Sequence, residues 1–200
     1  MGYDNSVNEP ISTENVFKDI RKRILKLELE PGQRVSENQI CAEYGVSRSV
    51  IRNVFARLSQ MKLIEVYPQR GTYVALFDLH YISELLLIRM AVEKEVLYQM
   101  FTKLTKEECD RYIALLEENL KEQEKFGSLS SYEKDFRRLD YDFHKILVDS
   151  VKLPGVLELL SDNMIHIARW RNFVVAFEHQ VPKLIEEHKA VVEFLKAGNL

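Results

Sequence analysis

The chain has 200 residues, of which 46% are hydrophobic, and a formal net charge of −3 at pH 7. It contains no run of about 18 apolar residues and no basic start followed by an apolar segment, so we expect a cytoplasmic protein with no membrane partner. The two cysteines stand singly, which argues against a disulfide framework and against a cysteine-rich zinc site.

Charge is distributed unevenly along the chain. Residues 15–76 carry 11 lysines and arginines against 6 acidic residues, whereas residues 77–200 carry 17 against 22. Residues 1–14 carry three acidic residues and are expected to form a flexible tail. A basic module thus precedes an acidic one. The basic excess suits either a nucleic-acid surface or an ordinary solvated surface.

The first part of the basic module is predicted to form two helices. Apolar residues recur at helical spacing over residues 16–27, and Pro31-Gly32 signals a turn after them. Ser36 and Gln39 have the spacing of a capping box at the start of a short second helix. Gly45 is expected to end this helix in a tight turn.

A third helix is expected after Ser47, the natural N-cap residue. Its apolar side chains recur at i, i+3, i+4 and i+7, as in a helix packed on a core: Ile51, Val54, Phe55 and Leu58. The opposite face and first turn carry small polar and basic side chains: Arg48, Ser49, Arg52 and Asn53. Because arginine can donate to guanine or phosphate and asparagine can pair with adenine, this face is a candidate for the DNA major groove.

A β-hairpin is predicted after Met61, where the apolar period changes from 3.6 to 2 on both sides of the segment 68–71. Arg70 lies at its tip. Helices joined by a short glycine turn, followed by a hairpin with a basic tip, are typical of a winged helix-turn-helix. An arginine on one solvated helix is common in any protein, but the combination in this order favours DNA binding.

The segment 31–74, PGQRVSENQICAEYGVSRSVIRNVFARLSQMKLIEVYPQRGTYV, resembles the DNA-binding domain of GntR-family transcriptional regulators. The resemblance implies DNA contacts at the recognition helix, near the phosphates and at the wing tip. The residues that it implicates are Arg48 and Arg52, Asn38, and Arg70 with Gly71. Val50, often proline, and Asn53, often glutamate, depart from the usual pattern, so the operator sequence cannot be copied from relatives.

Residues 77–200 show no strand-like alternation and are predicted to form an all-α helical bundle. Thr105 and Glu108 are spaced as a capping box. A turn-rich break is expected at residues 127–131. The five expected helices span about residues 79–101, from 105 onward, 132–151, 154–177 and 182–197.

Three polar residues of this bundle fall within apolar helical stripes. Asp140 and His144, four residues apart, share the side of their helix that carries Phe143, and His188 lies within the stripe of the last helix. A carboxylate and two imidazoles that point inward from two helices could bind one metal ion. The alternatives are a hydrogen-bonded core histidine and a simple Asp–His ion pair.

The segments RRLDYDFHKILVDS and IEEHKAVVEFLKAGN resemble two signature segments of the FCD effector domain, the helical C-terminal domain of FadR-like GntR regulators. Many such domains hold a divalent metal with one Asp and three His, and Asp140, His144 and His188 match three of these positions. This mixture of oxygen and nitrogen ligands suits Zn, Ni or Mn. Such domains usually continue into one more helix that bears the final histidine, so the resemblance implies that this chain lacks its last helix.

Three further residues are candidates for an effector pocket. The segment IRMAVEKEV resembles the first helix of the FCD domain and makes Arg89 a candidate. His166 and Arg169 are three residues apart, with Arg171 nearby, so they could line a pocket and hold a carboxylate. A solvated basic edge on an amphipathic helix is the alternative.

These features together predict a metabolite-responsive DNA-binding regulator. We expect a homodimer on a pseudopalindromic operator, acting as a repressor that a small carboxylate effector releases by changing the spacing of its two recognition helices. One alternative is a ligand-independent DNA-binding protein whose helical domain only dimerises. The other is a metal-dependent enzyme, which the absence of an evident general base or nucleophile argues against.

Overall fold

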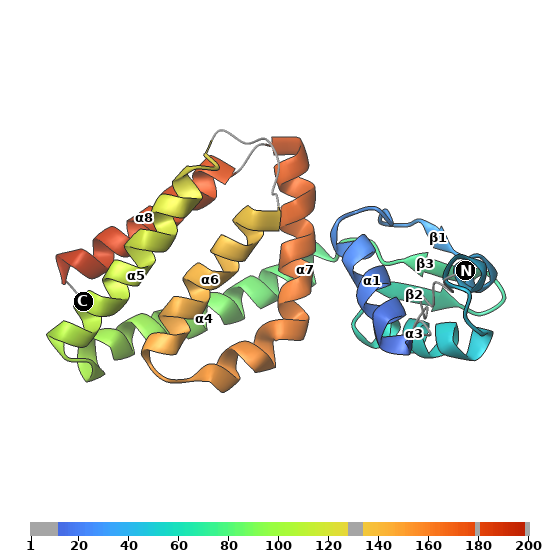
Figure 1. The fold of residues 1–200 in the computed structure, drawn as a ribbon, viewed down its shortest axis with the longest axis horizontal. Helices are drawn as coiled ribbons and strands as arrows, with labels where there is room; N and C mark the ends of the chain where they lie inside the picture. Colours follow the sequence, from blue (N-terminus) through green and yellow to red (C-terminus); the bar gives the residue numbers. More distant parts are fainter. Residues whose placement is uncertain (1–11, 128–133, 179–180, 199–200) are drawn as a thin grey trace, which may run out of the picture. The chain divides into compact units, whose positions relative to one another are not determined.

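The computed structural model describes residues 12–127, 134–178 and 181–198, which form two compact units that divide between Phe77 and Asp78 (Figure 1). Most of the expected N-terminal tail and of the turn-rich break lies outside the described residues. Helix α1 already begins at Thr13, inside the stretch that was expected to be a flexible tail.

The first unit is a winged helix-turn-helix, as predicted. Its helices are α1 (Thr13–Leu25), α2 (Glu37–Tyr44) and α3 (Arg48–Gln60), and its hairpin comprises β2 (Ile64–Tyr67) and β3 (Gly71–Val74). A short strand, β1 (Arg34–Val35), also pairs with β3 and gives the antiparallel order β1-β3-β2. The sequence did not predict β1, because two residues are too few to show a period of two.

Contacts from α1 hold the recognition helix in place. The predicted apolar stripe of α3 is confirmed, since its four members are at most 3% exposed. The guanidinium of Arg57 lies 3.6 Å from the centre of the Phe17 ring, and its Nη1 atom lies 2.9 Å from Oε2 of Glu14. Tyr44 at the end of α2 donates a hydrogen bond to Asp19 of α1. The two helices of the helix-turn-helix are thus both anchored to α1.

All three residues predicted at helix starts occupy N-cap positions, but only Thr105 makes a side-chain capping hydrogen bond. Ser36 and Ser47 occupy the N-cap positions of α2 and α3, but neither side chain accepts a capping hydrogen bond, so the predicted Ser36–Gln39 capping box is wrong. The Ser47 hydroxyl instead lies 2.8 Å from that of Ser49, and these helix starts are open to water, which can satisfy the first N–H groups. The predicted Thr105–Glu108 box is confirmed.

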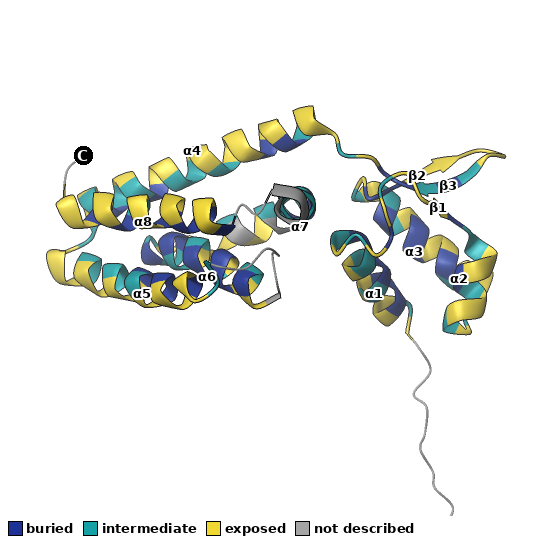
Figure 2. Ribbon diagram, turned by 90° about the horizontal axis from the view of Figure 1, so that it is seen from above, coloured by how far each residue is buried: buried dark blue, intermediate teal, exposed yellow. Residues whose placement is uncertain are grey.

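The second unit is helical throughout its described residues, as predicted. Its helices are α4 (Leu79–Lys103), α5 (Lys106–Glu124), α6 (Lys134–Ser150), α7 (Pro154–Glu178) and α8 (Val181–Ala197). Helix α6 packs against α4, α5 and α7, and α5 also packs against α8. The helices turn buried faces toward one another (Figure 2). Helix α6 is therefore the central element of this unit.

Helix α4 differs from the prediction in which residues it buries. Ile82, Leu85 and Val96 are buried as expected, but Leu86 is 36% exposed. Helix α4 carries apolar residues on more than one side, so its spacing alone could not tell which side faces the core. Among the described residues, no helix is both long and apolar enough to span a bilayer.

Gly45 is predicted to be required by the turn between α2 and α3. Its φ of 63° and ψ of 30° lie in the left-handed region, and a Cβ atom at this position would meet no other atom within 4 Å, so only backbone strain opposes a side chain. Gly45→Ala should therefore lower the free energy of unfolding by about 1–2 kcal/mol in urea titrations followed by circular dichroism. Gly155→Ala is the control, because Gly155 lies in α7 without a positive φ and with equally open space; it should not lower stability. Equal effects of the two substitutions would contradict this account.

Candidate DNA interface and metal centre

The outer face of α3 presents its polar side chains to solvent. Arg48, Ser49, Arg52 and Asn53 are all exposed, and so is Asn38 on α2. Nε of Arg52 lies 3.2 Å from Oε2 of Glu37, with 68% of the arginine side chain exposed. Since an ion pair this exposed contributes at most about 1 kcal/mol, the guanidinium can exchange it for DNA at little cost.

The wing presents Arg70 at an exposed turn. The N–H of Arg70 donates to the carbonyl of Tyr67 at 3.0 Å, and Gln69 and Gly71 on either side have positive φ values of 61° and 114°. A Cβ atom at Gly71 would lie 3.0 Å from Nε of Arg34, so glycine allows Arg34 to lie against the wing. Arg34 is thus a second basic residue of the wing. Sequence reasoning missed it because β1 was not predicted.

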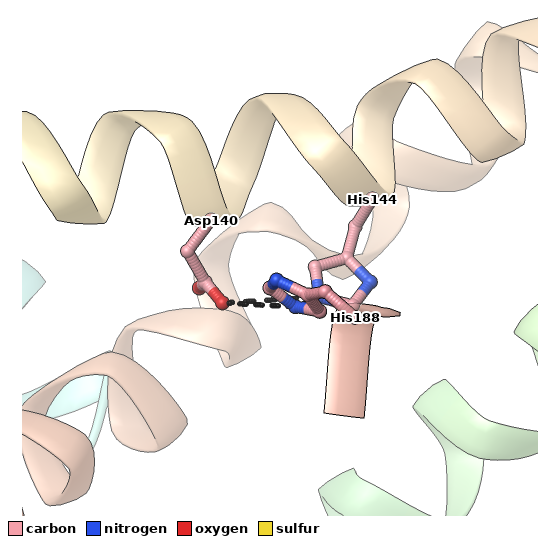
Figure 3. A group of neighbouring side chains, drawn as sticks. All are labelled: Asp140, His144 and His188. Atoms are coloured by element: carbon pink, nitrogen blue, oxygen red, sulfur yellow. Dashed lines mark hydrogen bonds and ion pairs between the residues drawn. The ribbon is translucent and has the colours of Figure 1, made fainter. Parts of the chain in front are cut away.

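The second unit brings Asp140, His144 and His188 together, as the sequence predicted. Asp140 and His144 extend from one side of α6 toward His188 of α8 (Figure 3). One ligand atom from each residue lies within 4.8 Å of the others. The two Nε2 atoms are 3.1 Å apart, and Oδ1 of Asp140 lies 3.5 Å from Nε2 of His188. Asp140 and His188 are buried, and His144 is half-buried.

The other nitrogen of each imidazole faces an oxygen. Nδ1 of His144 lies 2.8 Å from Oε1 of Glu93, and Nδ1 of His188 lies 2.7 Å from Oε1 of Gln123. The His188 ring also stacks on Phe143, with ring centres 4.2 Å apart and planes inclined by 15°. Nδ1 of His188 is therefore placed to carry the proton of the neutral ring, whereas Nδ1 of His144 lies close to the Glu93 carboxylate without meeting hydrogen-bond geometry.

This arrangement fits a cation. If both Nδ1 atoms are protonated, both Nε2 atoms present lone pairs, and these lone pairs face one another at 3.1 Å. Two lone pairs in contact repel unless a proton or a metal ion lies between or beside them. Histidine ligands of metals commonly donate their second N–H to a carboxylate or carbonyl oxygen, as His188 can to Gln123, and the Glu93 carboxylate lies 2.8 Å from the second nitrogen of His144. The donor set therefore suits a divalent ion of the Zn, Ni or Mn type.

Asp140 is held by an arginine that sequence reasoning mentioned only as a neighbour. Nη1 of Arg171 on α7 lies 2.8 and 2.6 Å from the two carboxylate oxygens. Burial opposes ionisation of Asp140, but nearby positive charge, that of Arg171 above all, outweighs it and holds the pKa of this carboxyl well below its usual value. Asp140 is thus a carboxylate at any ordinary pH, and it already faces a positive charge.

Electrostatics keeps the histidines neutral. Burial lowers the pKa of His188 to about 3. Burial and then the charge of Arg89 lower the pKa of His144. Burial also opposes the charge on Glu93, but His144 and Arg89 outweigh it and lower the pKa of Glu93 to about 2. A neutral imidazole is the form that binds a metal.

The three residues predicted for an effector pocket have separate surroundings. Nε of Arg89 lies 2.8 Å from Oε1 of Glu93, so Arg89 is linked to His144 through that carboxylate. His166 is buried with its ring edge against Tyr81, the ring centres being 5.3 Å apart. Arg169 is 1% exposed, and burial lowers its pKa to about 10.

Sequence reasoning did not assign three residues that surround the candidate metal centre, namely Glu93, Gln123 and Arg171. Two carried a readable signal. Gln123 follows Leu116 and Leu120 at helical spacing, so it is a polar residue within an apolar stripe. Glu93 lies four residues after Arg89, within a segment already under consideration. Arg171 could not be found this way, because its contact with Asp140 joins two helices.

Comparisons with known proteins agree with the two-unit fold. Residues 12–74 match the family described as bacterial regulatory proteins, gntR family, and residues 84–200 match the FCD domain. The chain is 28% identical to the uncharacterized HTH-type transcriptional regulator YdhC of Bacillus subtilis, over 92% of this chain and 80% of that protein. It is 25% identical to the HTH-type transcriptional repressor RspR of Escherichia coli, over 94% and 80%.

A solved structure of E. coli McbR/YncC resembles this chain with a TM-score of 0.61 at 18% sequence identity, over 94% of this chain and 87% of that one. At this identity the likeness concerns the fold. It supports the arrangement of a winged helix-turn-helix followed by a helical unit.

The buried Asp140, His144 and His188 cluster predicts how stability changes with pH in chelator-treated protein. The folded pKa of His188 is about 3 and its ordinary value is 6.5, so between these values only the unfolded chain binds the proton. The free energy of unfolding should therefore fall as the pH decreases from 6.5, and Asp140 and Glu93 should add to the loss once their unfolded forms protonate below about 4.5.

The single tryptophan, Trp170, lies on α7, so its fluorescence reports unfolding of the second unit in urea titrations at pH 7.5, 6, 5 and 4. His188→Gln should reduce the slope between pH 6.5 and 5. The same slope in the variant and the wild type would mean that His188 titrates in the folded protein as it does in the unfolded chain.

Proposed function

Because the chain belongs to the GntR family of bacterial regulatory proteins and carries an FCD domain, we propose that this transcriptional regulator is a metabolite-responsive repressor with a metal-assisted effector site. The observation that carries the proposal is the buried cluster of Asp140, His144 and His188, in which two imidazole nitrogens and a carboxylate converge on one point. A repressor is proposed because the relative RspR is named as one.

The DNA-binding role draws on the exposed face of α3 and on the wing. Arg48, Ser49, Arg52 and Asn53 are the proposed groove-facing residues, and Asn38 with Arg70 and Gly71 the proposed backbone contacts. The basic excess of residues 15–76 supports attraction to phosphate. Arg34 joins the proposal as a further wing contact, because it lies against Gly71.

The proposed effector is a small carboxylate. A divalent ion held by the three ligands supplies a positive centre with further coordination positions, where a carboxylate oxygen can bind. Arg171 is the proposed partner for the second oxygen, since its guanidinium already binds the carboxylate of Asp140. Arg89 is a weaker candidate because it is paired with Glu93, and Arg169 and His166 are proposed as lining residues on the helix that carries Arg171.

Dimerisation is supported by the surface of α4. This helix leaves large apolar side chains at least 36% exposed: Leu79, Leu86, Leu87, Ile88, Met90 and Tyr98. Apolar patches of this kind mark interaction surfaces. We propose a second copy of the chain as the partner, because a two-fold dimer reads a pseudopalindromic operator with two recognition helices. Effector binding would then change operator affinity by linkage, through its preference for one arrangement of the dimer.

The two alternatives are weighed by the same observations. A ligand-independent regulator gives no reason to bury a carboxylate and two histidines at one point, where each costs desolvation. Membership of a regulator family argues against a metal-dependent enzyme. Removing metal with a chelator should change operator affinity for a sensor and leave it unchanged for a ligand-independent protein.

Arg52→Ala should weaken operator binding by about 1–3 kcal/mol, because one groove contact of that size is lost. Fluorescence anisotropy with a duplex selected by the protein from random DNA measures the effect. Arg138→Ala is the matched control, since it removes one equally exposed positive charge from α6, outside the DNA-binding unit. Added salt should weaken binding steeply. Unchanged affinity in a folded Arg48→Ala, Arg52→Ala double variant would remove the proposed interface.

Protein purified without chelator or histidine tag should carry about one divalent ion per chain, as determined by elemental analysis. Asp140→Ala and His188→Ala should abolish this content, because each removes a ligand. His80→Ala is the control, since His80 is a largely exposed histidine on α4. If the wild type holds no more metal than His188→Ala, the cluster is a hydrogen-bonded core network and the metal part of the proposal fails.

A further inference from the structure

We infer that Asn119 and Gln123 of α5 are positioning residues that fix His188 in the tautomer whose Nε2 atom is free to bind a cation. The inference rests on the proposed metal centre and goes beyond its ligands. Neither residue belongs to the candidate ligand set, yet both lie in a chain of hydrogen bonds that ends on a ligand.

Which group donates and which accepts in each of these hydrogen bonds follows from the first one. The carbonyl oxygen of Leu139 can only accept, so Asn119 must present its amide nitrogen, which lies 3.2 Å away. The Asn119 oxygen therefore faces Gln123, whose amide nitrogen donates to it at 2.6 Å. Gln123 is left with its oxygen toward Nδ1 of His188 at 2.7 Å. Nδ1 must then carry the proton, and Nε2 carries the lone pair.

Burial makes this direction costly to reverse. Gln123 is fully buried, and Asn119 and His188 are 8% and 4% exposed. Rotating either amide group by 180° would place oxygen against oxygen or N–H against N–H, and no water could reach these buried groups to supply the lost hydrogen bonds. A residue needed only for packing could be apolar at position 123, as Leu116 and Leu120 are on the same stripe. The buried amides are thus explained by their effect on the imidazole.

The series of hydrogen bonds also joins the helices that supply the candidate ligands. Leu139 immediately precedes Asp140 on α6. From its carbonyl oxygen the series of hydrogen bonds passes through Asn119 and Gln123 of α5 to His188 on α8. Phe143, stacked on the His188 ring, sets the plane of the imidazole, whereas Gln123 sets which edge carries the proton. Ring plane and protonation are therefore determined by different neighbours. Substitution of Asn119 or Gln123 should therefore change which nitrogen of His188 is protonated without changing the plane of the ring.

The tautomer can be measured directly in metal-free protein. Nitrogen-15 NMR of histidine-labelled protein separates a protonated ring nitrogen from an unprotonated one, and His188→Gln assigns the signal. Wild-type His188 should be protonated at Nδ1. Gln123→Met, of similar size but without an acceptor, should shift the population toward protonation at Nε2. Asn119→Ala should give a mixture, because the Gln123 amide is then free to turn.

The matched control is Gln99→Met on α4. Gln99 also donates through its amide nitrogen and accepts through its oxygen, to Glu95 and from Lys103, but it is outside the metal centre. This variant should leave the His188 signal unchanged. Wild-type His188 protonated at Nε2, or an unchanged Nδ1–H signal in both Gln123→Met and Asn119→Ala, would overturn the inference.

Zinc affinity, measured by competition with a chromophoric chelator, gives a second readout. Gln123→Met should bind Zn²⁺ about 10–100-fold more weakly than the wild type, the usual effect of removing an outer partner of a histidine ligand. Gln99→Met should bind as the wild type does. Equal affinity in Gln123→Met would overturn the functional part of the inference. A wild type that binds no Zn²⁺ but shows the Nδ1–H tautomer would instead reject the metal proposal and leave the hydrogen-bond chain standing.

Discussion

The second unit is organised around two imidazole nitrogens that face each other at 3.1 Å beside a buried carboxylate. Such a contact between neutral rings is unfavourable when both nitrogens present lone pairs, and it becomes favourable when a cation accepts them. The surrounding residues keep the two rings neutral and leave their facing nitrogens available to a cation. Glu93 and Gln123 occupy the outer edges of the two rings, and burial keeps the rings neutral.

The central position of α6 explains why these groups meet. Helix α6 contributes both Asp140 and His144 to the cluster and packs against α4 and α5, which supply Glu93 and Gln123. Arg171 reaches Asp140 from α7. Side chains of α4, α7 and α8 thus meet side chains of α6, and Gln123 of α5 joins the cluster through His188. An ion bound at this cluster would contact side chains that link most helices of this unit, which suits the proposed sensor role.

The sequence predicted much of the molecule because its strongest signals are local. The stripe of α3, the period change at the hairpin, the α5 capping box and the inward positions of Asp140, His144 and His188 all follow from spacing along one element. The strand β1 and the buried side of α4 could not be predicted in this way. Two residues are too few to show a period, and α4 carries apolar residues on more than one side.

The outer part of the cluster was beyond sequence reasoning for a different reason. The Arg171–Asp140 ion pair and the Gln123–His188 hydrogen bond join residues 31 and 65 positions apart, so only the packing of helices brings them together. The Asn119–Leu139 contact also involves a backbone carbonyl, which leaves no mark in the sequence. The local sequence signal for the site was a polar residue within an apolar helical stripe. Gln123 shows that this signal also marks residues that contact a candidate ligand without being one.

X-ray absorption spectroscopy of Zn²⁺-loaded protein tests most directly whether both imidazoles bind one ion. The account predicts two imidazole ligands at about 2.0–2.1 Å with an oxygen ligand beside them, and the loss of one imidazole in each of His144→Ala and His188→Ala. A spectrum without imidazole scattering, or one that stays the same in both variants, would contradict the assignment of this cluster as a metal centre.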